Sequence, residues 1–148
     1  MIKIEKYEPN DQVEQIADKI YQVMTDVYEV SPWTKEQLAR DLTAPYSSYF
    51  LAWEAENLVG FLAILSSDFE AEILQIAIKR AYQGQGIATA LFEHLPADKE
   101  LFLEVRQSNS PALLFYQKEK FKEIARRKSY YHEPVEDAII MKRETNER

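Results

Sequence analysis

A short turn with two glycines is the stretch of this chain best suited to hold a charged ligand. It follows an apolar run from Ile73 to Ile78, and it precedes a segment from Ile87 whose alanines and leucine favour a helix. Glycine allows backbone conformations that are closed to other residues and lets a ligand approach the chain closely. The first N–H groups of a helix have no helical partners. A strand, a glycine turn and a helix in this order therefore predict a phosphate-binding loop.

Two other interpretations of the turn stand beside phosphate binding. The plain one is a flexible strand-to-helix connection without a ligand. The other is a dinucleotide fingerprint, because residues 84–89 nearly spell GxGxxG and Glu104 lies twenty residues after Gly84. However, Thr89 stands where the third glycine would be. The segments before the turn also predict hairpins rather than parallel crossovers, which disfavours the dinucleotide interpretation.

Glu104 is the most informative single residue. It lies in the otherwise apolar segment 100–106, where an unpaired carboxylate would be costly to bury. It therefore faces either an ionic partner, such as Arg106 or the basic run 126–128, or a wet cleft. In a cleft it could act as a general base, because partial burial raises the pKa of a carboxyl group. Tyr116, twelve residues later, could reach the same opening, or it could be a core tyrosine with its hydroxyl at the rim.

Composition excludes several kinds of site. A chain of 148 residues predicts one domain over residues 1–148 that buries about two-thirds of its unfolded surface. The absence of cysteine excludes disulfides and thiolate chemistry. The two histidines are too few and too far apart to suggest a metal site. No signal-peptide core and no apolar run of the ~20 residues needed for a membrane span is present, so we expect a cytoplasmic protein without a membrane partner.

The charge of the chain is negative and uneven. Its 18 basic and 25 acidic residues give a net charge of −7, which disfavours direct nucleic-acid binding because that requires a basic face. Residues 1–75 carry 14 acids and 5 bases, whereas residues 76–148 carry 11 acids and 13 bases. The first half could be a plain solvated surface, or it could steer a cationic substrate.

The hydrophobic patterns predict an α/β fold. A first strand is followed by a helix that Asn10 or Asp11 caps and that runs to Val27, and Thr34 with Gln37 predicts a capping box for a second helix. Three strands in an antiparallel meander then lead to the glycine turn, with a hairpin turn at residues 56–57. Later elements are predicted at residues 100–106, 110–119 (capped by Asn109), 121–131 and 138–142.

The turn also carries a family signature. Gln83-Gly84-Gln85-Gly86-Ile87-Ala88 matches the Q/R-x-x-G-x-G/A signature of the GNAT acyltransferase superfamily. The order of predicted elements resembles the whole GNAT fold, a central, mostly antiparallel twisted sheet flanked by helices. Within the superfamily, the chain is similar to bacterial enzymes that acetylate the amino-terminal alanine of a small-subunit ribosomal protein. The segments that carry this similarity are Pro32-Trp33, Leu103-Glu104-Val105-Arg106, Ser108-Asn109, Phe115-Tyr116, Tyr130-Tyr131 and residues 136–141.

The resemblance implies acetyl-CoA as cosubstrate, no metal, and a set of site residues. Glu104 would take a proton from the substrate amine through water, and Tyr116 would protonate the departing thiolate. Asn109 would contact the cofactor. Apart from the resemblance, we expect Trp33 and Tyr131 to wall the peptide groove, although Trp33, in the joint between the first two helices, could instead be a hydrophobic plug. Backbone groups of a strand would pair with the pantetheine arm, and the turn would hold the diphosphate. These cofactor-binding residues are Ile76, Ala77, Ile78, Gln83, Gly84, Gln85, Gly86, Ile87, Ala88 and Thr89.

We therefore expect acetylation of a protein amino terminus, by direct attack of the amine on the thioester, in a monomer or weak dimer. The same fold could instead acetylate a small amine or a lysine side chain, or bind acyl-CoA without turnover. Three features depart from the family pattern. The segment 92–99 is short, Gly84 replaces a residue that is often basic, and Lys120 replaces the glycine that is common at the end of the last helix.

Overall fold

The computed structural model describes residues 1–132 and 134–145. They form two compact units, unit 1 with residues 1–66 and 74–95, and unit 2 with residues 67–73 and the described residues from 96 onward. The prediction of one domain stays a prediction. The elements are β1 (Ile2–Lys6), α1 (Val13–Val27), α2 (Lys35–Leu42), β2 (Ser47–Glu54), β3 (Asn57–Ser66), β4 (Glu70–Ile78), η1 (Arg80–Tyr82), α3 (Ile87–Phe92), β5 (Glu100–Arg106), α4 (Ser110–Lys118), β6 (Lys122–His132) and β7 (Val135–Arg143).

The strands follow the order β1-β2-β3-β4-β5-β7-β6 in one seven-stranded sheet. The pairs β1–β2, β2–β3, β5–β7 and β6–β7 are antiparallel. The pair β4–β5 is parallel, with Glu70 to Glu72 opposite Glu100 to Phe102. The predicted mixed α/β fold with a mostly antiparallel sheet is confirmed.

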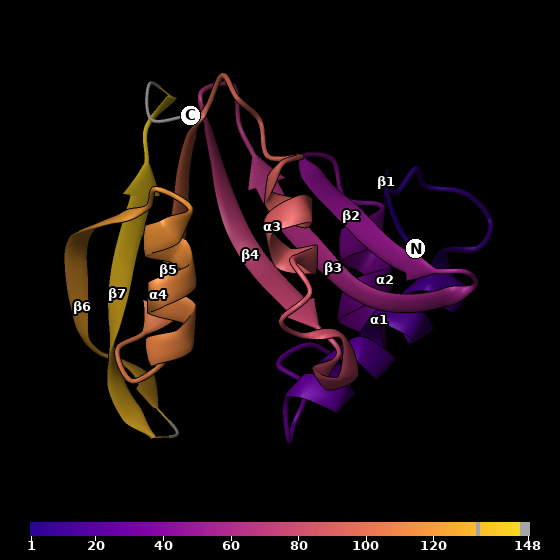
Figure 1. Ribbon diagram of the computed structural model, residues 1–148, viewed down its shortest axis with the longest axis horizontal. Coiled ribbons are helices and arrows are strands. Elements are labelled where there is room, and N and C mark those ends of the chain that lie inside the picture. Colours follow the sequence, from indigo (N-terminus) through magenta and orange to yellow (C-terminus); the bar gives the residue numbers. More distant parts are fainter. Residues whose placement is uncertain (133, 146–148) are drawn as a thin grey trace. The chain divides into compact units, whose positions relative to one another are not determined.

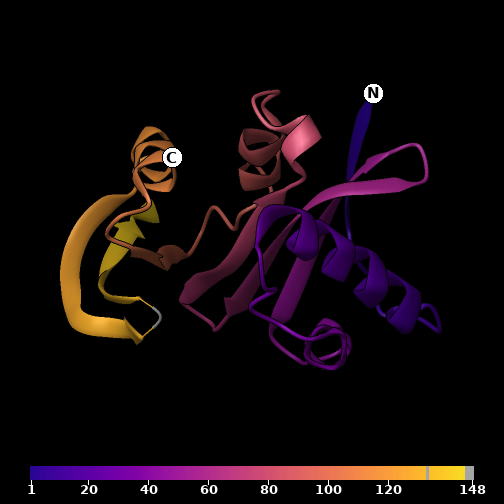
Figure 2. The same cartoon turned by 90° about the horizontal axis from the view of Figure 1, so that it is seen from below.

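In unit 1, helices cover both faces of the strands. Helices α1 and α2 pack on one face of β2 and β3, and α3 packs on the other face (Figures 1 and 2). The apolar face of α1 is buried through Ile20, Val23 and Met24, whose spacing of three and four residues repeats the helical period. They pack with Leu38 of α2 and Phe61 of β3 in one core. Each such buried side chain contributes about 1.5–3 kcal/mol by leaving water.

In unit 2, the strict alternation along β5 separates a core face from a polar face. Leu101, Leu103 and Val105 are buried, whereas Glu104 and the other alternate residues are partly exposed. Helix α4 lies over one face of β5 and β7 (Figures 1 and 2). The C-terminal end of α4 is tied to β7, because Arg143 Nη1 donates to the carbonyl of Glu119 at 3.0 Å. The face of β5 that carries Glu104 is therefore partly exposed.

Several predicted boundaries are confirmed and some are wrong. β5 has the predicted bounds, and the capping box is present, with Gln37 N–H donating to Thr34 Oγ1 and Thr34 N–H to Gln37 Oε1. The hairpin turn lies one residue earlier than predicted, because β2 ends at Glu54 and β3 begins at Asn57. Helix α1 has Gln12 at its N-cap, and Asn10 Oδ1 instead accepts from the N–H of Gln12 at 2.7 Å. In the described ranges, no helix is long and apolar enough to cross a membrane.

Candidate active site

The glycine turn depends on two residues with left-handed backbone. Gly84 has φ +79° and Gly86 has φ +81°, and Gly86 is the N-cap of α3. A Cβ atom built on either glycine would meet no atom within 4 Å. Space is therefore open at both positions, and glycine is required because L side chains disfavour positive φ. The turn is exposed from Gln83 to Gly86, so its backbone is accessible to a ligand.

The end of β4 that leads into the turn is held against β3. The N–H of Lys79 donates to the carbonyl of Val59 at 2.8 Å, and Gln83 Nε2 donates to the carbonyl of Ile78 at 3.0 Å. Gly60 of β3 allows this approach, because a Cβ there would come within 2.6 Å of Ile78 Cδ1. Ala77 and Ile78 are buried. Of the residues predicted to meet the pantetheine arm, Ile76 alone is partly exposed through its side chain.

Glu104 lies on the polar face of unit 2 with an ionic partner. Its Oε1 is 3.7 Å from Nη2 of Arg127, and the two side chains are 23% and 53% exposed. The sequence predicted either Arg106 or the run 126–128 as the partner of Glu104, and in the structure the partner is Arg127. Arg106 instead pairs with Glu136, with Nη1 and Oε1 3.7 Å apart. An exposed pair at this distance contributes little, about 0–1 kcal/mol. The carboxylate of Glu104 is thus accessible and only loosely held.

Glu72 belongs to the same polar face, and the sequence interpretation missed it. Glu72, on β4, lies opposite Phe102 of β5. Phe102 precedes Glu104 by two residues, so Glu72 and Glu104 lie on the same face of the sheet. Burial raises the pKa of the Glu72 carboxyl above 4.5, the negative charge of Glu104 raises it further, and Arg127 opposes both. The signal was the alternation of Glu70 and Glu72 with apolar residues, which places acidic groups on one face of a strand.

Tyr116 is fixed by the way α4 ends. The N–H of Phe121 donates to the carbonyl of Tyr116 at 2.9 Å, and the N–H of Lys120 donates to that of Gln117 at 3.1 Å. These two bonds define a Schellman motif in which Lys120 takes the left-handed position, with φ +75°. The rings of Tyr116 and Phe121 meet edge to face with centroids 6.1 Å apart. Lys120, where the family commonly has glycine, thus holds a backbone conformation that L residues disfavour, yet the helix still ends in a Schellman motif.

Tyr131 lies in a group of aromatic and basic side chains at the end of β6. The guanidinium of Arg106 is 4.2 Å from its ring centroid, and the ring of Tyr130 meets it edge to face at 5.2 Å. Burial raises the pKa of the Tyr131 hydroxyl, with a further contribution from Glu104. Glu136 accepts hydrogen bonds from the hydroxyl and the N–H of Ser108, which lower the pKa of its carboxyl group.

Trp33 and Asn109 have structural contacts. Trp33, in unit 1, is partly buried against the core cluster, and its carbonyl accepts from Ser31 Oγ at 2.6 Å. Asn109, in unit 2, caps α4 by accepting from the N–H of Ala112 at 3.3 Å. Their roles in binding stay predictions.

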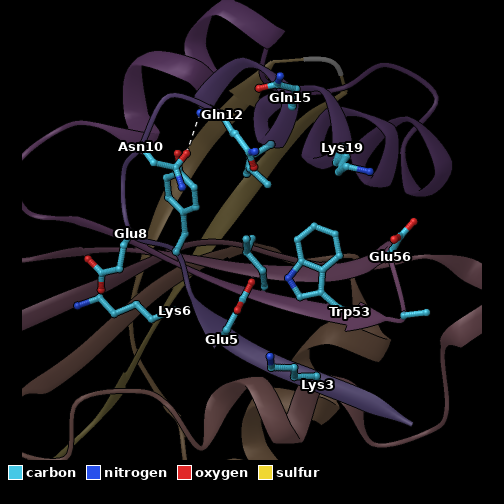
Figure 3. Close-up of a pocket in the computed structure, with 14 residues that line it drawn as sticks. Lys3, Glu5, Lys6, Glu8, Asn10, Gln12, Gln15, Lys19, Trp53 and Glu56 are labelled. Carbon is cyan, nitrogen blue, oxygen red and sulfur yellow. Dashed lines mark hydrogen bonds between the residues drawn. The ribbon is translucent and has the colours of Figure 1, made fainter.

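A groove of about 660 Å³ lies in unit 1 between β1, β2 and α1. Figure 3 shows the Trp53 ring between α1 and β1, with Lys3 and Glu5 on the strand side and Lys19 on the helix side. None of the predicted site residues lines it. Because its walls carry both lysines and glutamates, it offers no basic face to an anionic cofactor. Within the described ranges, no group of three or more His, Cys, Asp or Glu side chains could hold a metal ion.

Comparison with known proteins identifies the family. The family model described as Acetyltransferase (GNAT) family matches residues 11–121. The chain belongs to the GNAT acetyltransferase family. The match includes the glycine turn, Glu104 and Tyr116, and it makes this GNAT chain an acetyltransferase.

Three relatives place the chain more closely within the GNAT family. A Bacillus subtilis protein that provisionally bears the name ribosomal protein bS18-alanine N-acetyltransferase is 36% identical over 131 residues, 84% of this chain and 86% of the relative. The Haemophilus ducreyi enzyme of that name is 34% identical over 138 residues, 87% of this chain and 94% of the relative. The crystal structure of the Escherichia coli ribosomal-protein-S18-alanine N-acetyltransferase superposes with a TM-score of 0.83, at 28% identity, over 97% of this chain and 93% of that one.

Proposed function

We propose that this chain transfers the acetyl group of acetyl-CoA to the α-amine of a protein amino terminus, the terminal alanine of a small-subunit ribosomal protein. The observation that supports this most is the exposed turn with left-handed glycines at positions 84 and 86, at the start of α3. The turn occurs in a GNAT chain that matches, over most of their length, relatives named as ribosomal-protein-alanine N-acetyltransferases.

Acetyl-CoA would be held by the main chain of unit 1. The first-turn N–H groups of α3 and the amides of the turn, residues 84–89, suit an anionic diphosphate. Backbone groups of Ile76 to Ile78 would pair with the amides of the pantetheine arm as an added strand. Gln83 has its side-chain amide committed to the carbonyl of Ile78, so it would act by stiffening the turn.

Groups of unit 2 would handle the protons. The substrate amine attacks the thioester carbonyl carbon, a C–N bond forms and the C–S bond breaks. Glu104 takes the proton that the amine gives up, through a water molecule, and Tyr116 gives a proton to the departing thiolate. An α-amine has a pKa near ~8 and a lysine amine near ~10.4, so deprotonating a chain terminus costs about 3 kcal/mol less. A carboxylate as exposed as that of Glu104 is a sufficient base for it.

Specificity for a peptide would come from aromatic walls. Tyr131 is stiffened by Arg106 and Tyr130, and Trp33 packs against the core cluster of unit 1. Rigid aromatic rings lose little entropy when they contact a peptide. We propose that both rings contact the first residues of the acceptor.

The experiment is a thiol-release assay with acetyl-CoA and a peptide that begins with alanine, run beside the same peptide with a blocked amino terminus. We expect CoA release with the free peptide and background release with the blocked one. Equal release with both peptides, or binding of acetyl-CoA without release for either, would contradict the proposed function.

A further inference from the structure

The stem of the glycine turn, residues 79–83, is held by two carboxylates from distant parts of unit 1. The first is Asp26, the second-to-last residue of α1. Its Oδ2 accepts from the backbone N–H of Arg80 at 2.7 Å, and Nη2 of Arg80 donates back to the carbonyl of Val27 at 3.3 Å. Asp26 thus caps the 3₁₀ turn η1 from another element, and the two bonds join the end of α1 to the stem.

The second carboxylate is Glu54, the last residue of β2. Its Oε1 accepts from the hydroxyl of Tyr82 at 2.7 Å, and this bond raises the pKa of Tyr82. Tyr82 is the last residue of η1 and directly precedes Gln83. The stem is therefore held from α1 at its start and from β2 at its end.

The turn beyond the stem is built differently. Gly84 and Gly86 have open space around them, and glycine gives the unfolded or unbound turn many conformations. A loop that must be ordered when its ligand binds loses affinity, whereas a loop that is already ordered does not. Fixing the stem reduces the number of conformations open to the unbound turn, and so reduces the entropy that the turn loses when the ligand binds.

Direct contact with the cofactor is a poor role for these carboxylates. A diphosphate is anionic, and a negatively charged side chain beside it would repel it. Each carboxylate also already accepts a short hydrogen bond from the stem. Their chemistry suits a role that acts through the backbone.

We propose that Asp26 and Glu54 are positioning residues that hold the stem of the glycine turn so that its amides are ready to receive the diphosphate. This inference rests on the proposed function, in which the turn binds acetyl-CoA. It adds that the affinity for acetyl-CoA depends on two side chains that do not touch it.

The test measures the acetyl-CoA dissociation constant by calorimetry for Asp26→Ala, Glu54→Ala and Tyr82→Phe. Each variant removes one hydrogen bond to or from a charged group, so we expect a dissociation constant raised ~5- to 10-fold. Asp26→Asn and Glu54→Gln keep an acceptor oxygen and should stay close to wild type. Asp18→Ala on α1 removes an ion pair with Lys35 of 2.7 Å, and Glu56→Ala in the turn after β2 truncates an exposed side chain. Both are matched controls, because the partner of Asp18 lies outside the stem and Glu56 is exposed to solvent.

Steady-state kinetics separate positioning from a general loss of structure. At saturating acetyl-CoA the kcat of each variant should equal that of wild type, with the change confined to the KM for acetyl-CoA. Tyr82→Phe removes a single hydroxyl, so it keeps the test valid if an alanine variant folds poorly.

Three results overturn the inference. Dissociation constants within twofold of wild type for all three variants would show that the stem needs no anchor. Asn and Gln variants as weak as the Ala variants would show that the charge acts instead of the hydrogen bond, and a fall in kcat alone would indicate a different role. If wild type itself does not bind acetyl-CoA, the proposed function fails instead.

Discussion

Glu104 meets two requirements of a general base that conflict in most carboxylates. It lies on a strand whose other face is core, which holds its backbone rigidly, and its side chain is still 23% exposed and reachable by water. The 3.7 Å contact with Arg127 pairs the carboxylate without enclosing it. The alternation of side chains along β5 thus both fixes the position of Glu104 and leaves its carboxylate accessible to water.

Glu104→Gln should lower kcat by about 10²- to 10⁴-fold, because the amide cannot accept the proton of the amine. The acetyl-CoA dissociation constant should stay within a few-fold, since Glu104 has no assigned role in ground-state cofactor binding. Steady-state turnover and calorimetry check the two parts. Glu123→Gln is the matched control, because Glu123 also pairs with an arginine, Arg126 at 3.1 Å. A loss of affinity that matches the loss of turnover would contradict a base and indicate a binding residue.

Glu72 leads to a prediction about pH. Its pKa is raised in the folded chain, so the folded chain binds this proton more tightly than the unfolded chain. The stability from that proton is present at low pH and is lost as the pH rises through the raised value. Glu72→Gln cannot ionise, so its Tm should exceed that of wild type at pH 8, and the difference should shrink as the pH falls toward 4.5. Thermal melts across this range check it, with the exposed Glu70→Gln as control; an unchanged or lower Tm at pH 8 would contradict the prediction.

At the scale of elements, the clearest local signals gave correct predictions. The bounds of β5 follow from strict alternation, and the start of α4 follows from Asn109 and Pro111, a cap and a first-turn proline. The start of α3 follows from Gly86. In each case the residues that define the element are neighbours in the sequence, so a short window contains the physical cause.

Contacts between distant residues could not be predicted in this way. The bond from Arg80 to Asp26 joins residues 54 apart, and that from Tyr82 to Glu54 joins residues 28 apart. Neither Asp26 nor Glu54 has its partner within a short window of sequence, so these bonds appear only when the elements pack. The choice of Arg127 over Arg106 as the partner of Glu104 has the same origin, because it depends on the β6–β7 register and its irregularity near residue 127.

The end of α4 gives an element-scale prediction. Lys120 occupies a left-handed position that costs an L residue about 1–2 kcal/mol, partly offset by the greater chain entropy of glycine. Lys120→Gly should therefore raise the free energy of unfolding by about 0.5–1 kcal/mol. Lys118→Gly, inside the last turn of α4, should lower it by about as much. Chemical denaturation measures both, and a Lys120→Gly variant less stable than wild type would contradict the Schellman geometry.

Across the whole molecule, the acidic residues are concentrated in the first half of the chain, and the proposed site groups are divided between the two units. Residues 1–75 carry a net charge of −9, from 14 acids and 5 bases, and unit 1 contains most of this segment. The proposed cofactor turn lies in unit 1, and the proposed proton-transfer groups lie in unit 2. An acidic surface attracts a basic protein over distances of about 10 Å or more at low salt.

Salt should therefore weaken the attraction of a basic acceptor peptide and leave the acetyl-transfer step unchanged. Raising NaCl from about 20 mM to about 200 mM should lower kcat/KM several-fold for an alanine-terminated peptide rich in arginine, because the Debye length shortens. An alanine-terminated peptide without net charge should change little. Initial rates at low peptide concentration check this, and equal salt dependence for both peptides would show that the acidic half has no role in substrate attraction.

The location of the transferred acetyl group is the sharpest test of the proposed acetylation of an amino terminus. A peptide with a free amino-terminal alanine and an internal lysine is incubated with the protein and acetyl-CoA, and fragment-ion mass spectrometry then locates the modification. We expect one acetyl group, on the α-amine. Acetylation of the lysine instead, or an unmodified peptide from protein that binds acetyl-CoA, would contradict it.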